Sequence, residues 1–349
     1  MKEIFYFIIR YTSRLSMYAF FSKVELVGTD RIPRGKPLLF APNHQNAFLD
    51  AFVVGGMSPV AIHYLTRADV FNKKFLWILE GLHMMPIYRM RDGFGKLSQN
   101  VGVFEACQKL FSNGKSVLIF PEGSHGEPYY LRGLTKGTSR LAFESQEVLG
   151  DDKELWIQPV GLNYFDQRKP RRKAMFVFGE PIRVNDYMEQ YQTQKARALI
   201  QLRDTVKNHI SDCLIIPDED EHYEEKVAAL TKANEKYAFE ELKEKLSKNE
   251  LKGPERKPRP IFKKIGQLLG LVNIPPLLLM KYILSKKIKD VVFSSSIKWA
   301  VGLFGFPIWW LIVFGAVSMA AGNQIAGIVI ASMIVLLFLR QEFIKIGEG

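Results

Sequence analysis

Hydrophobic residues in the first half of the chain occur in short runs that are separated by polar turns and by amphipathic stretches. Five runs are typical of buried strands: Val24–Val27, Leu38–Ala41, Ser116–Phe120, Ile157–Leu162 and Met175–Phe178. Between them, apolar residues recur at helical spacing from Phe94 to Phe111 and again from Thr135 to Glu147. This alternation predicts an α/β fold in which helices flank a parallel or mixed sheet, with functional groups at the strand ends.

We expect this core to fill residues 23–213, and the pattern changes beyond it. Within the core, residues 186–213 are predicted to form one long helix. Residues 214–260 mix charges of both signs and are predicted to form one or two solvated helices and a linker. Residues 261–298 combine Leu-rich stretches with lysines, which indicates a segment that lies on a membrane surface.

Residues 299–340 carry the strongest membrane signal, because Ala300–Leu339 contains no charged residue. The run divides at Gly322, and its first half can cross roughly 30 Å of hydrocarbon, whereas the second half requires tilting or a thinner bilayer. Basic residues on both flanks predict a transmembrane hairpin with both ends in the cytoplasm, hence an integral membrane protein whose core, residues 23–213, faces the cytoplasm. The alternative is a buried helical hairpin in a soluble protein.

Residues 1–22 are predicted to form an amphipathic, interfacial helix, with a surface helix docked on the core as the alternative.

Charge and cysteine content narrow the possible partners. The 349 residues carry a net charge of +12, so nucleic acid, an anionic membrane surface or a phosphorylated substrate fits. No nucleic-acid-binding motif accompanies the charge, and a membrane explains it better. Cys107 and Cys213 lie in apolar helical patterns, which indicates buried thiols. The histidines show no metal-ligand spacing, so we expect no metal.

The stretch Asn43–Asp50 follows a predicted buried strand and holds a candidate general base. His44 and Asp50 can meet if His44 lies in a strand-to-helix turn and Asp50 lies one turn into the helix. A histidine held by a carboxylate can take a proton from a nucleophile. Because neither Ser nor Cys stands in this stretch, the attacking group belongs to the substrate, which favours transfer onto a hydroxyl over covalent hydrolysis. A structural histidine beside a capping Asn43 is the alternative.

Further candidates follow other strands. Glu122, Gly123, Ser124 and His125 come directly after the run ending at Phe120, in a Pro/Gly turn that displays the acid. Arg89 ends a short apolar strand and can bind a phosphate, as can Lys136 at the start of a helix. Alternatively, Glu122 forms a salt bridge or caps a helix, and the basic side chains are exposed to solvent.

Together these residues resemble the glycerolipid acyltransferase superfamily, of the lysophosphatidic acid acyltransferase type. Its NHxxxxD block is similar to Asn43–Asp50, and its arginine block is similar to Pro86–Arg89. Its FPEG block is similar to Phe120–Gly123 with Lys136-Gly137 downstream, and its proline-containing apolar block is similar to Ile157–Val160. The four blocks occur in the family's order across residues 20–190.

The resemblance implies direct transfer of an acyl group from acyl-CoA or acyl carrier protein to a glycerolipid hydroxyl at a phospholipid membrane. His44 is then the base and Asp50 orients it, and no cofactor takes part. The implied substrate-binding residues are Asn43, Arg89, Glu122, Gly123, Ser124 and Lys136. We expect 1-acylglycerol-3-phosphate as the acceptor, which would yield phosphatidic acid.

His125 departs from this type, because many members carry arginine there. The stretch from Gly123 to Gly137 looks closer to the glycerol-3-phosphate acyltransferases of the same superfamily. Glycerol-3-phosphate and other lyso-lipids therefore stay open as acceptors. A lipid or thioester hydrolase, and a non-catalytic module that binds acidic lipids, are the competing hypotheses.

Overall fold

The computed structural model describes residues 1–88, 100–126, 130–166, 168–217, 220–233, 236–251, 257–288 and 290–348. They form two compact units. The first unit comprises residues 1–14, 25–163 and 175–216, and the second comprises residues 15–24, 164–174 and 217–349.

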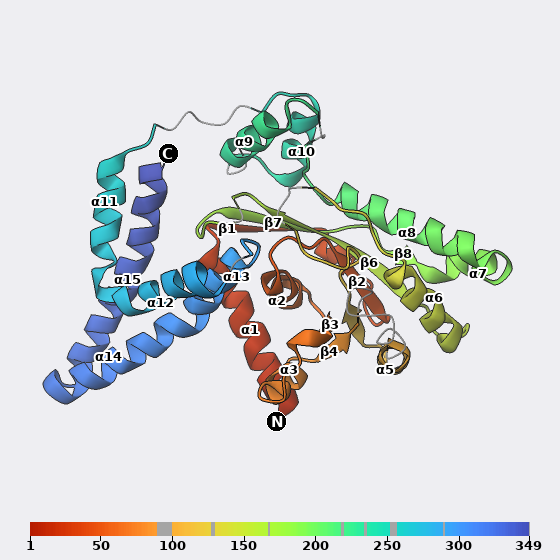
Figure 1. Cartoon of the computed structure of the whole chain (residues 1–349), viewed down its shortest axis with the longest axis horizontal. Coiled ribbons are helices and arrows are strands. Elements are labelled where there is room, and N and C mark those ends of the chain that lie inside the picture. The colour runs from red at the N-terminus through yellow and green to blue at the C-terminus, as the bar shows by residue number, and fades with distance from the viewer. Residues whose placement is uncertain are drawn as a thin grey trace. The chain divides into compact units, whose positions relative to one another are not determined.

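An eight-stranded sheet organises the first unit (Figure 1). Its strand order is β1-β7-β6-β2-β5-β3-β4, and β8 pairs with β6. The pairs of β2 with β5 and β6, and of β3 with β4 and β5, are parallel, whereas β8 runs antiparallel to β6. The predicted mixed sheet flanked by helices is confirmed. The strands are β1 Lys23–Val27, β2 Leu38–Pro42, β3 Ile62–Arg67, β4 Met84–Ile87, β5 Ser116–Leu118, β6 Trp156–Tyr164, β7 Lys173–Phe178 and β8 Ile182–Arg183.

All five strands expected from apolar runs are present, but β3 was not expected. Its sequence, from Ile62 to Arg67, alternates apolar residues with His63 and polar residues, so it shows no continuous run. It nevertheless lies between β5 and β4. Its apolar side chains Ile62 and Leu65 are buried.

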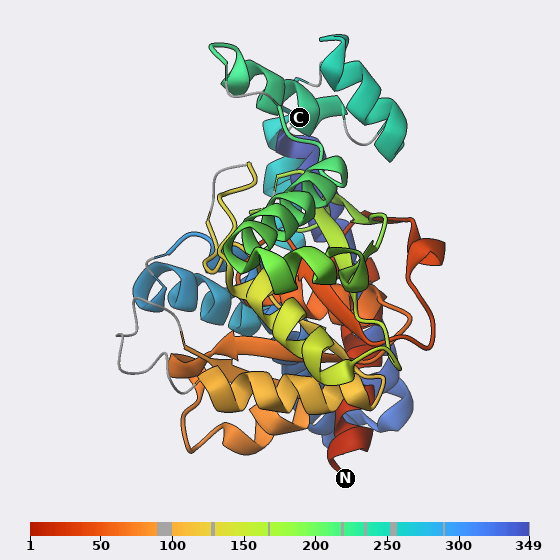
Figure 2. The ribbon, with the colours of Figure 1, turned by 90° about the vertical axis from the view of Figure 1, so that its right-hand side faces the viewer.

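Helices cover both faces of the sheet. The helices α5 (Asn100–Ser112), α6 (Gly137–Leu149) and α8 (Lys195–Asp212) lie on one face, in front of the sheet in Figure 2. Their buried apolar side chains share a core with β2 and β5. The helix α2 (Phe48–Met57) lies on the other face (Figure 1). The short α3 spans Leu76–Gly81.

The single long helix expected over residues 186–213 is wrong. The structure instead has a short 3₁₀ turn, then α7 (Met188–Thr193) and α8. The break falls at Gln194, whose φ of −139° and ψ of 59° are not helical. The apolar periodicity continues on both sides of the break, so the sequence pattern suggested one helix.

The N-terminal helix α1 (Lys2–Phe20) is anchored through its first part to the first unit. The Tyr6 hydroxyl donates to the Ile62 carbonyl at 3.1 Å and accepts from the Ile62 amide at 2.8 Å. Arg10 donates to the carbonyls of Gly55 and Ser58 at the end of α2, where unpaired carbonyls favour a cation. Arg10 therefore serves a structural contact within the protein.

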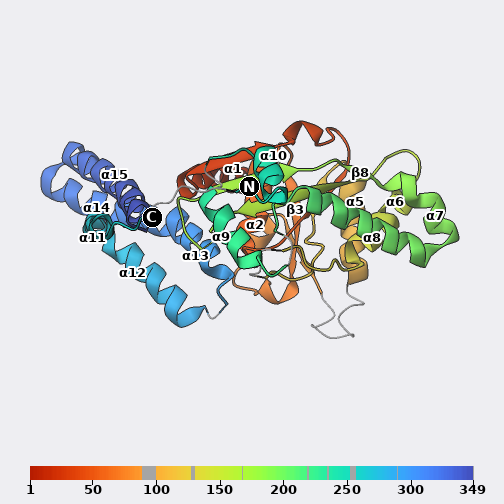
Figure 3. The ribbon, with the colours of Figure 1, turned by 90° about the horizontal axis from the view of Figure 1, so that it is seen from above.

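The second unit is helical over most of its described residues. Its helices are α9 Tyr223–Ala233, α10 Phe239–Ser247, α11 Pro260–Leu269, α12 Ile274–Tyr282, α13 Phe293–Ala300, α14 Phe306–Ala321 and α15 Asn323–Glu348. The stretch Phe293–Ala321 and α15 are long and apolar enough, by length and composition, to cross a membrane. α14 and α15 lie side by side (Figure 3), so the predicted pair of apolar C-terminal helices is confirmed.

Candidate active site

The candidate site lies where β2 and β5 end, at the point where the chain leaves the sheet in opposite directions. After β2 the chain crosses through α2 to β3, on the β4 side. After β5 it crosses through α6 to β6, on the other side. Ligands of open α/β sheets bind outside the carboxyl ends of the strands at such a switch point.

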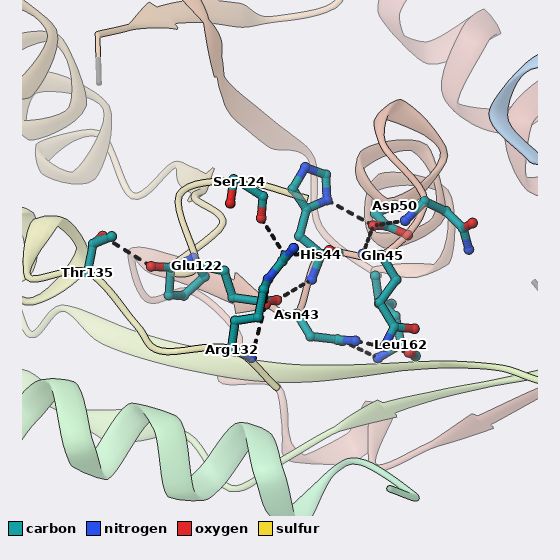
Figure 4. A network of polar contacts seen from close by, with 11 residues as sticks. Asn43, His44, Gln45, Asp50, Glu122, Ser124, Arg132, Thr135 and Leu162 are labelled. Atoms are coloured by element: carbon teal, nitrogen blue, oxygen red, sulfur yellow. Dashed lines mark hydrogen bonds and ion pairs between the residues drawn. The ribbon is translucent and has the colours of Figure 1, made fainter. Parts of the chain in front are cut away.

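The pairing of β2 with β5 brings together the motif around His44 and the motif around Glu122. Phe40 on β2 pairs with Leu118 on β5 in parallel register. His44 and Glu122 each lie four residues beyond this pair. The amide of His44 accordingly donates to Glu122 Oε1 at 2.6 Å (Figure 4).

The His44–Asp50 pair has the geometry expected of an oriented general base. His44 Nδ1 lies 2.9 Å from Asp50 Oδ2. The same oxygen accepts the backbone amides of Gln45 and Asn46, both at 2.8 Å. Asp50 is fully buried in the first turn of α2, and three donors compensate its charge. The His44 side chain is 13% exposed, so its ring can be reached from outside.

The hydrogen bond to Asp50 determines which nitrogen of His44 is available. A carboxylate at Nδ1 holds the proton of the neutral imidazole on that atom. Nε2 therefore carries the lone pair and can accept a proton. The Phe120 ring stacks on the imidazole with centroids 3.7 Å apart, which restricts its rotation.

Glu122 is held inside the protein by Arg132. Arg132 Nε lies 2.7 Å from Glu122 Oε2, and the Arg132 amide donates to the same oxygen at 3.2 Å. Arg132 Nη2 donates to the carbonyls of His44, at 2.9 Å, and Ser124 (Figure 4). Glu122 and Arg132 thus bind both the amide and the carbonyl of His44. A cation can compensate the charge of a buried carboxylate, but no pattern in the sequence singled out Arg132 for this role.

Asn43 joins β2 to β6. Its Oδ1 accepts the Leu162 amide at 2.7 Å and its Nδ2 donates to the Leu162 carbonyl at 3.2 Å. With 1% of its surface exposed, the Asn43 side chain fixes the strand that presents His44. Its assignment to substrate binding, and that of Glu122, stay predictions, since both side chains have these internal partners.

The remaining sequence candidates take different positions. Gly123 has a φ of +69°, and its amide donates to the Phe120 carbonyl in the turn that places Glu122. Ser124 contributes its carbonyl to Arg132. Lys136 is exposed and precedes the first residue of α6. Arg89 lies outside the described residues.

His125 stands beside the base. Its ring meets that of His44 edge to face, with centroids 5.5 Å apart. The sequence indicated a structural or acceptor-shaping residue at this position, and both roles stay predictions.

The two thiols lie outside this site, Cys107 on α5 and Cys213 at the end of α8. Cys107 and Cys213 are free and buried, as expected. Burial raises the pKa of the Cys107 thiol to about 12, so it is protonated at neutral pH. Within the described part of the chain, no three His, Cys, Asp or Glu side chains group as metal ligands.

Comparison with known proteins places this site in a family. Residues 23–163 match the Acyltransferase family model. The chloroplastic 1-acyl-sn-glycerol-3-phosphate acyltransferase of Arabidopsis thaliana is 24% identical over 40% of this chain and 38% of its own length. The corresponding chloroplastic enzyme of Brassica napus is 24% identical over 50% of this chain and 51% of its own length.

Two further matches are more limited. An uncharacterized acyltransferase of Schizosaccharomyces pombe is 33% identical over 28% of this chain and 15% of its own length. The crystal structure of the 1-acyl-sn-glycerophosphate acyltransferase of Thermotoga maritima aligns with a TM-score of 0.44 and 15% identity, over 59% of this chain and 78% of that one. The chain spans about half, or less, of the length of the curated relatives it matches.

The matched segment contains His44, Asp50, Glu122 and Arg132, so the family match and the hydrogen-bonded site coincide. Residues 23–163 are therefore an acyltransferase-family domain, which confirms the resemblance drawn from the motifs in the sequence.

Proposed function

We propose that this chain is a membrane-bound O-acyltransferase of phospholipid synthesis, which transfers an acyl group from acyl-CoA or acyl carrier protein to 1-acylglycerol-3-phosphate and forms phosphatidic acid. The observation that carries the proposal is the 2.9 Å contact between His44 Nδ1 and Asp50 Oδ2 inside an acyltransferase-family domain. The names of the plant relatives support this acceptor.

In the proposed reaction one proton moves from the acceptor to His44 and then to the leaving group. The acceptor hydroxyl donates its proton to His44 Nε2 as its oxygen attacks the thioester carbonyl. Collapse of the tetrahedral intermediate forms the ester and breaks the carbon–sulfur bond. The imidazolium then protonates the leaving thiolate and the base is restored. Asp50 stabilises the imidazolium while it exists.

The Glu122–Arg132 pair supports this chemistry by positioning the base. Because the pair binds the amide and the carbonyl of His44, it fixes the backbone from which the imidazole projects. A misplacement of about 1 Å can cost about 10²-fold in rate. We therefore assign Glu122 and Arg132 as positioning residues, with acceptor contacts left to Lys136, Ser124 and Arg89.

The membrane assignment follows from the second unit. Its two long apolar helices suit a protein whose acceptor and product are lipids. We propose an integral membrane protein in which the catalytic domain faces the cytoplasm, as the basic flanks of the hairpin indicate. The helix α1 and the segment 261–298 are proposed as further membrane-surface elements.

The test is acyl transfer by detergent-purified protein, with acyl-CoA and acyl carrier protein each offered against lysophosphatidic acid, glycerol-3-phosphate and another lysophospholipid. Product from lysophosphatidic acid supports the proposal. Product from glycerol-3-phosphate alone would make glycerol-3-phosphate the acceptor. The histidine at position 125 would then be relevant to the choice of acceptor. Thioester cleavage that ignores every acceptor would favour the hydrolase.

The matched variants are His44→Ala and His222→Ala. Loss of the base should lower kcat by about 10²–10⁴-fold. His222 is exposed in the second unit, and its replacement should leave turnover unchanged. Full turnover in His44→Ala would overturn the assignment of the base.

A further inference from the structure

The α14–α15 pair exposes many apolar side chains. The two helices are joined at Gly322 and carry no charged residue from Trp299 to Leu339. Leu311 is 72% exposed and Met319 is 87% exposed. A surface of this extent without any charge suits the hydrocarbon of a phospholipid bilayer. The question is how much of the pair can enter it.

The bend formed by α11 and α12 lies against this pair. α11 packs along the C-terminal end of α15 so closely that a Cβ on Gly347 would lie 2.5 Å from the Lys263 amide nitrogen. The rings of Phe262 and Phe343 stack with centroids 5.8 Å apart. Figure 1 shows the two helices side by side. The last turns of α15 are therefore covered by a helix that exposes lysines, including Lys263.

Asn273, between α11 and α12, pins this bend to both arms of the pair. Its Nδ2 donates to the Met333 carbonyl at 3.0 Å, and its Oδ1 accepts the Trp310 indole N–H at 2.9 Å. Met333 and Trp310 lie at similar distances along the chain from Gly322. Only about 16 Å of each arm extends beyond this junction, at about 1.5 Å per helical residue.

The charged loop of residues 168–172 limits how much of α15 can enter the bilayer. Arg171 Nε lies 2.9 Å from Glu342 Oε1, and its guanidinium lies over the Phe338 ring at 5.6 Å. Arg171 Nη1 also donates to the Phe21 carbonyl at 3.1 Å. Irregular backbone and paired charges of this kind do not lie in lipid hydrocarbon. The part of α15 that can be embedded therefore ends near Phe338.

The same loop is fastened to α15 at a second point and reaches the other arm. Arg172 and Lys169 both pair with Glu348, at 3.3 and 3.1 Å. Lys298 on α13 donates to the Arg168 carbonyl. The loop thus contacts both arms. Beyond Lys298 the first arm has about 35 Å of helix, so the tighter limit on insertion is the one on α15.

The limit on α15 gives an insertion depth shorter than a bilayer. From Asn323 to Phe338 the helix rises about 22 Å, even when it stands perpendicular to the membrane. The hydrocarbon core is roughly 30 Å thick. We propose that the α14–α15 hairpin enters the bilayer from the side that holds both its ends, and that its tip stops inside the hydrocarbon without emerging on the far side.

The tip itself is compatible with this position. Of the polar side chains at the tip, Ser318, Asn323 and Gln324, the first two hydrogen-bond to each other, which lowers the cost of burying them in lipid. Three exposed lysines, Lys281 at the end of α12 and Lys286 and Lys287 in the π-helical segment after it, are then available for headgroup phosphates. The proposal rests on the chain working at a membrane and is independent of the reaction it catalyses.

The experiment measures which side of the membrane the tip faces. Asn323→Cys and Glu221→Cys proteins are inserted into phosphatidylcholine–phosphatidylglycerol vesicles and treated with a membrane-impermeant maleimide, either outside or sealed inside. Glu221, 88% exposed in its side chain, marks the side of the second unit's solvated surface. The native thiols are buried, so the unaltered chain gives the background.

We expect Asn323→Cys to react on neither side until detergent is added, while Glu221→Cys reacts from outside. Labelling of Asn323→Cys from inside the vesicle would show a complete crossing and overturn the proposal. Labelling from outside at the rate of Glu221→Cys would show that the tip is not embedded, which overturns it as well.

A second variant tests whether an unreactive tip lies in lipid or is covered by protein. Ile328→Cys, at a position 67% exposed on α15, is labelled with an environment-sensitive fluorophore. Lipids brominated along the acyl chain should quench it strongly, and equal quenching of a fluorophore at Glu221→Cys would contradict embedding. Concentration-dependent self-association with no lipid quenching would instead show that a second copy covers the tip.

Discussion

Arg132 donates to the Glu122 carboxylate and to the His44 carbonyl at the same time, over 2.7 and 2.9 Å. The buried ion pair is thereby connected directly to the backbone of the proposed base. This relationship links stability and catalysis at one point, since loss of either charge affects both the fold of the turn and the orientation of the imidazole.

Removing Arg132 should therefore destabilise the protein as well as slow it. In Arg132→Met the Glu122 carboxylate, 2% exposed in its side chain, loses its cation, and breaking a buried pair costs about 3–5 kcal/mol. Thermal unfolding of Arg132→Met, Glu122→Gln and the double variant measures this. The double variant should be less destabilised than the sum of the two single variants, and simple additivity would contradict the pairing.

Asp50→Asn should impair turnover more than folding. The amide oxygen can still accept backbone N–H groups, but the side chain no longer stabilises an imidazolium or fixes the proton on His44 Nδ1. We expect kcat to fall by about 10²–10⁴-fold with little change in KM. Asp186→Asn, an exposed aspartate outside the site, is the control and should be unaffected.

Gly126→Ala should disturb Arg132. A Cβ at Gly126 would lie 1.9 Å from Arg132 Nη1, so the guanidinium must move away from the His44 carbonyl. We expect reduced kcat with substrate affinity largely retained. Gly133→Ala lies in the same loop with no atom within 4 Å of its Cβ, and should behave as the parent. Equal activity in the two variants would refute the positioning role of Arg132.

Acid should destabilise the first unit through His63. Burial, reinforced by the neighbouring His83, lowers the pKa of His63 from 6.5 to about 4. Between these values the unfolded chain binds more protons than the folded one, so stability falls as the pH is lowered from about 6.5 towards 4. Burial also lowers the pKa of His83, which stacks on His63, in the same direction.

The measurement is the melting temperature from pH 8 to pH 4 for the parent and His63→Asn. The variant should show a shallower decline below pH 6.5, whatever its stability at pH 8. Parallel curves would remove His63 as a source of the acid sensitivity.

The sequence by itself determined the strands whose residues form continuous apolar runs, because a strand buried on both faces needs such a run. It also placed His44 and Glu122 just beyond strand ends and Asp50 in the helix that follows His44, and it predicted the apolar C-terminal pair from the absence of charge. These features depend on local composition and spacing, which a single chain displays directly.

Tertiary structure decided what depends on distant residues. The register of β2 on β5 sets Glu122 against His44, and no local pattern shows that Arg132 closes the ring around the His44 backbone. The same holds for the hairpin: composition gives its length, but only the fold shows that Arg171 lies against Phe338. Pairing between remote segments is fixed by packing and hydrogen bonding in three dimensions, and periodicity along the chain does not encode it visibly.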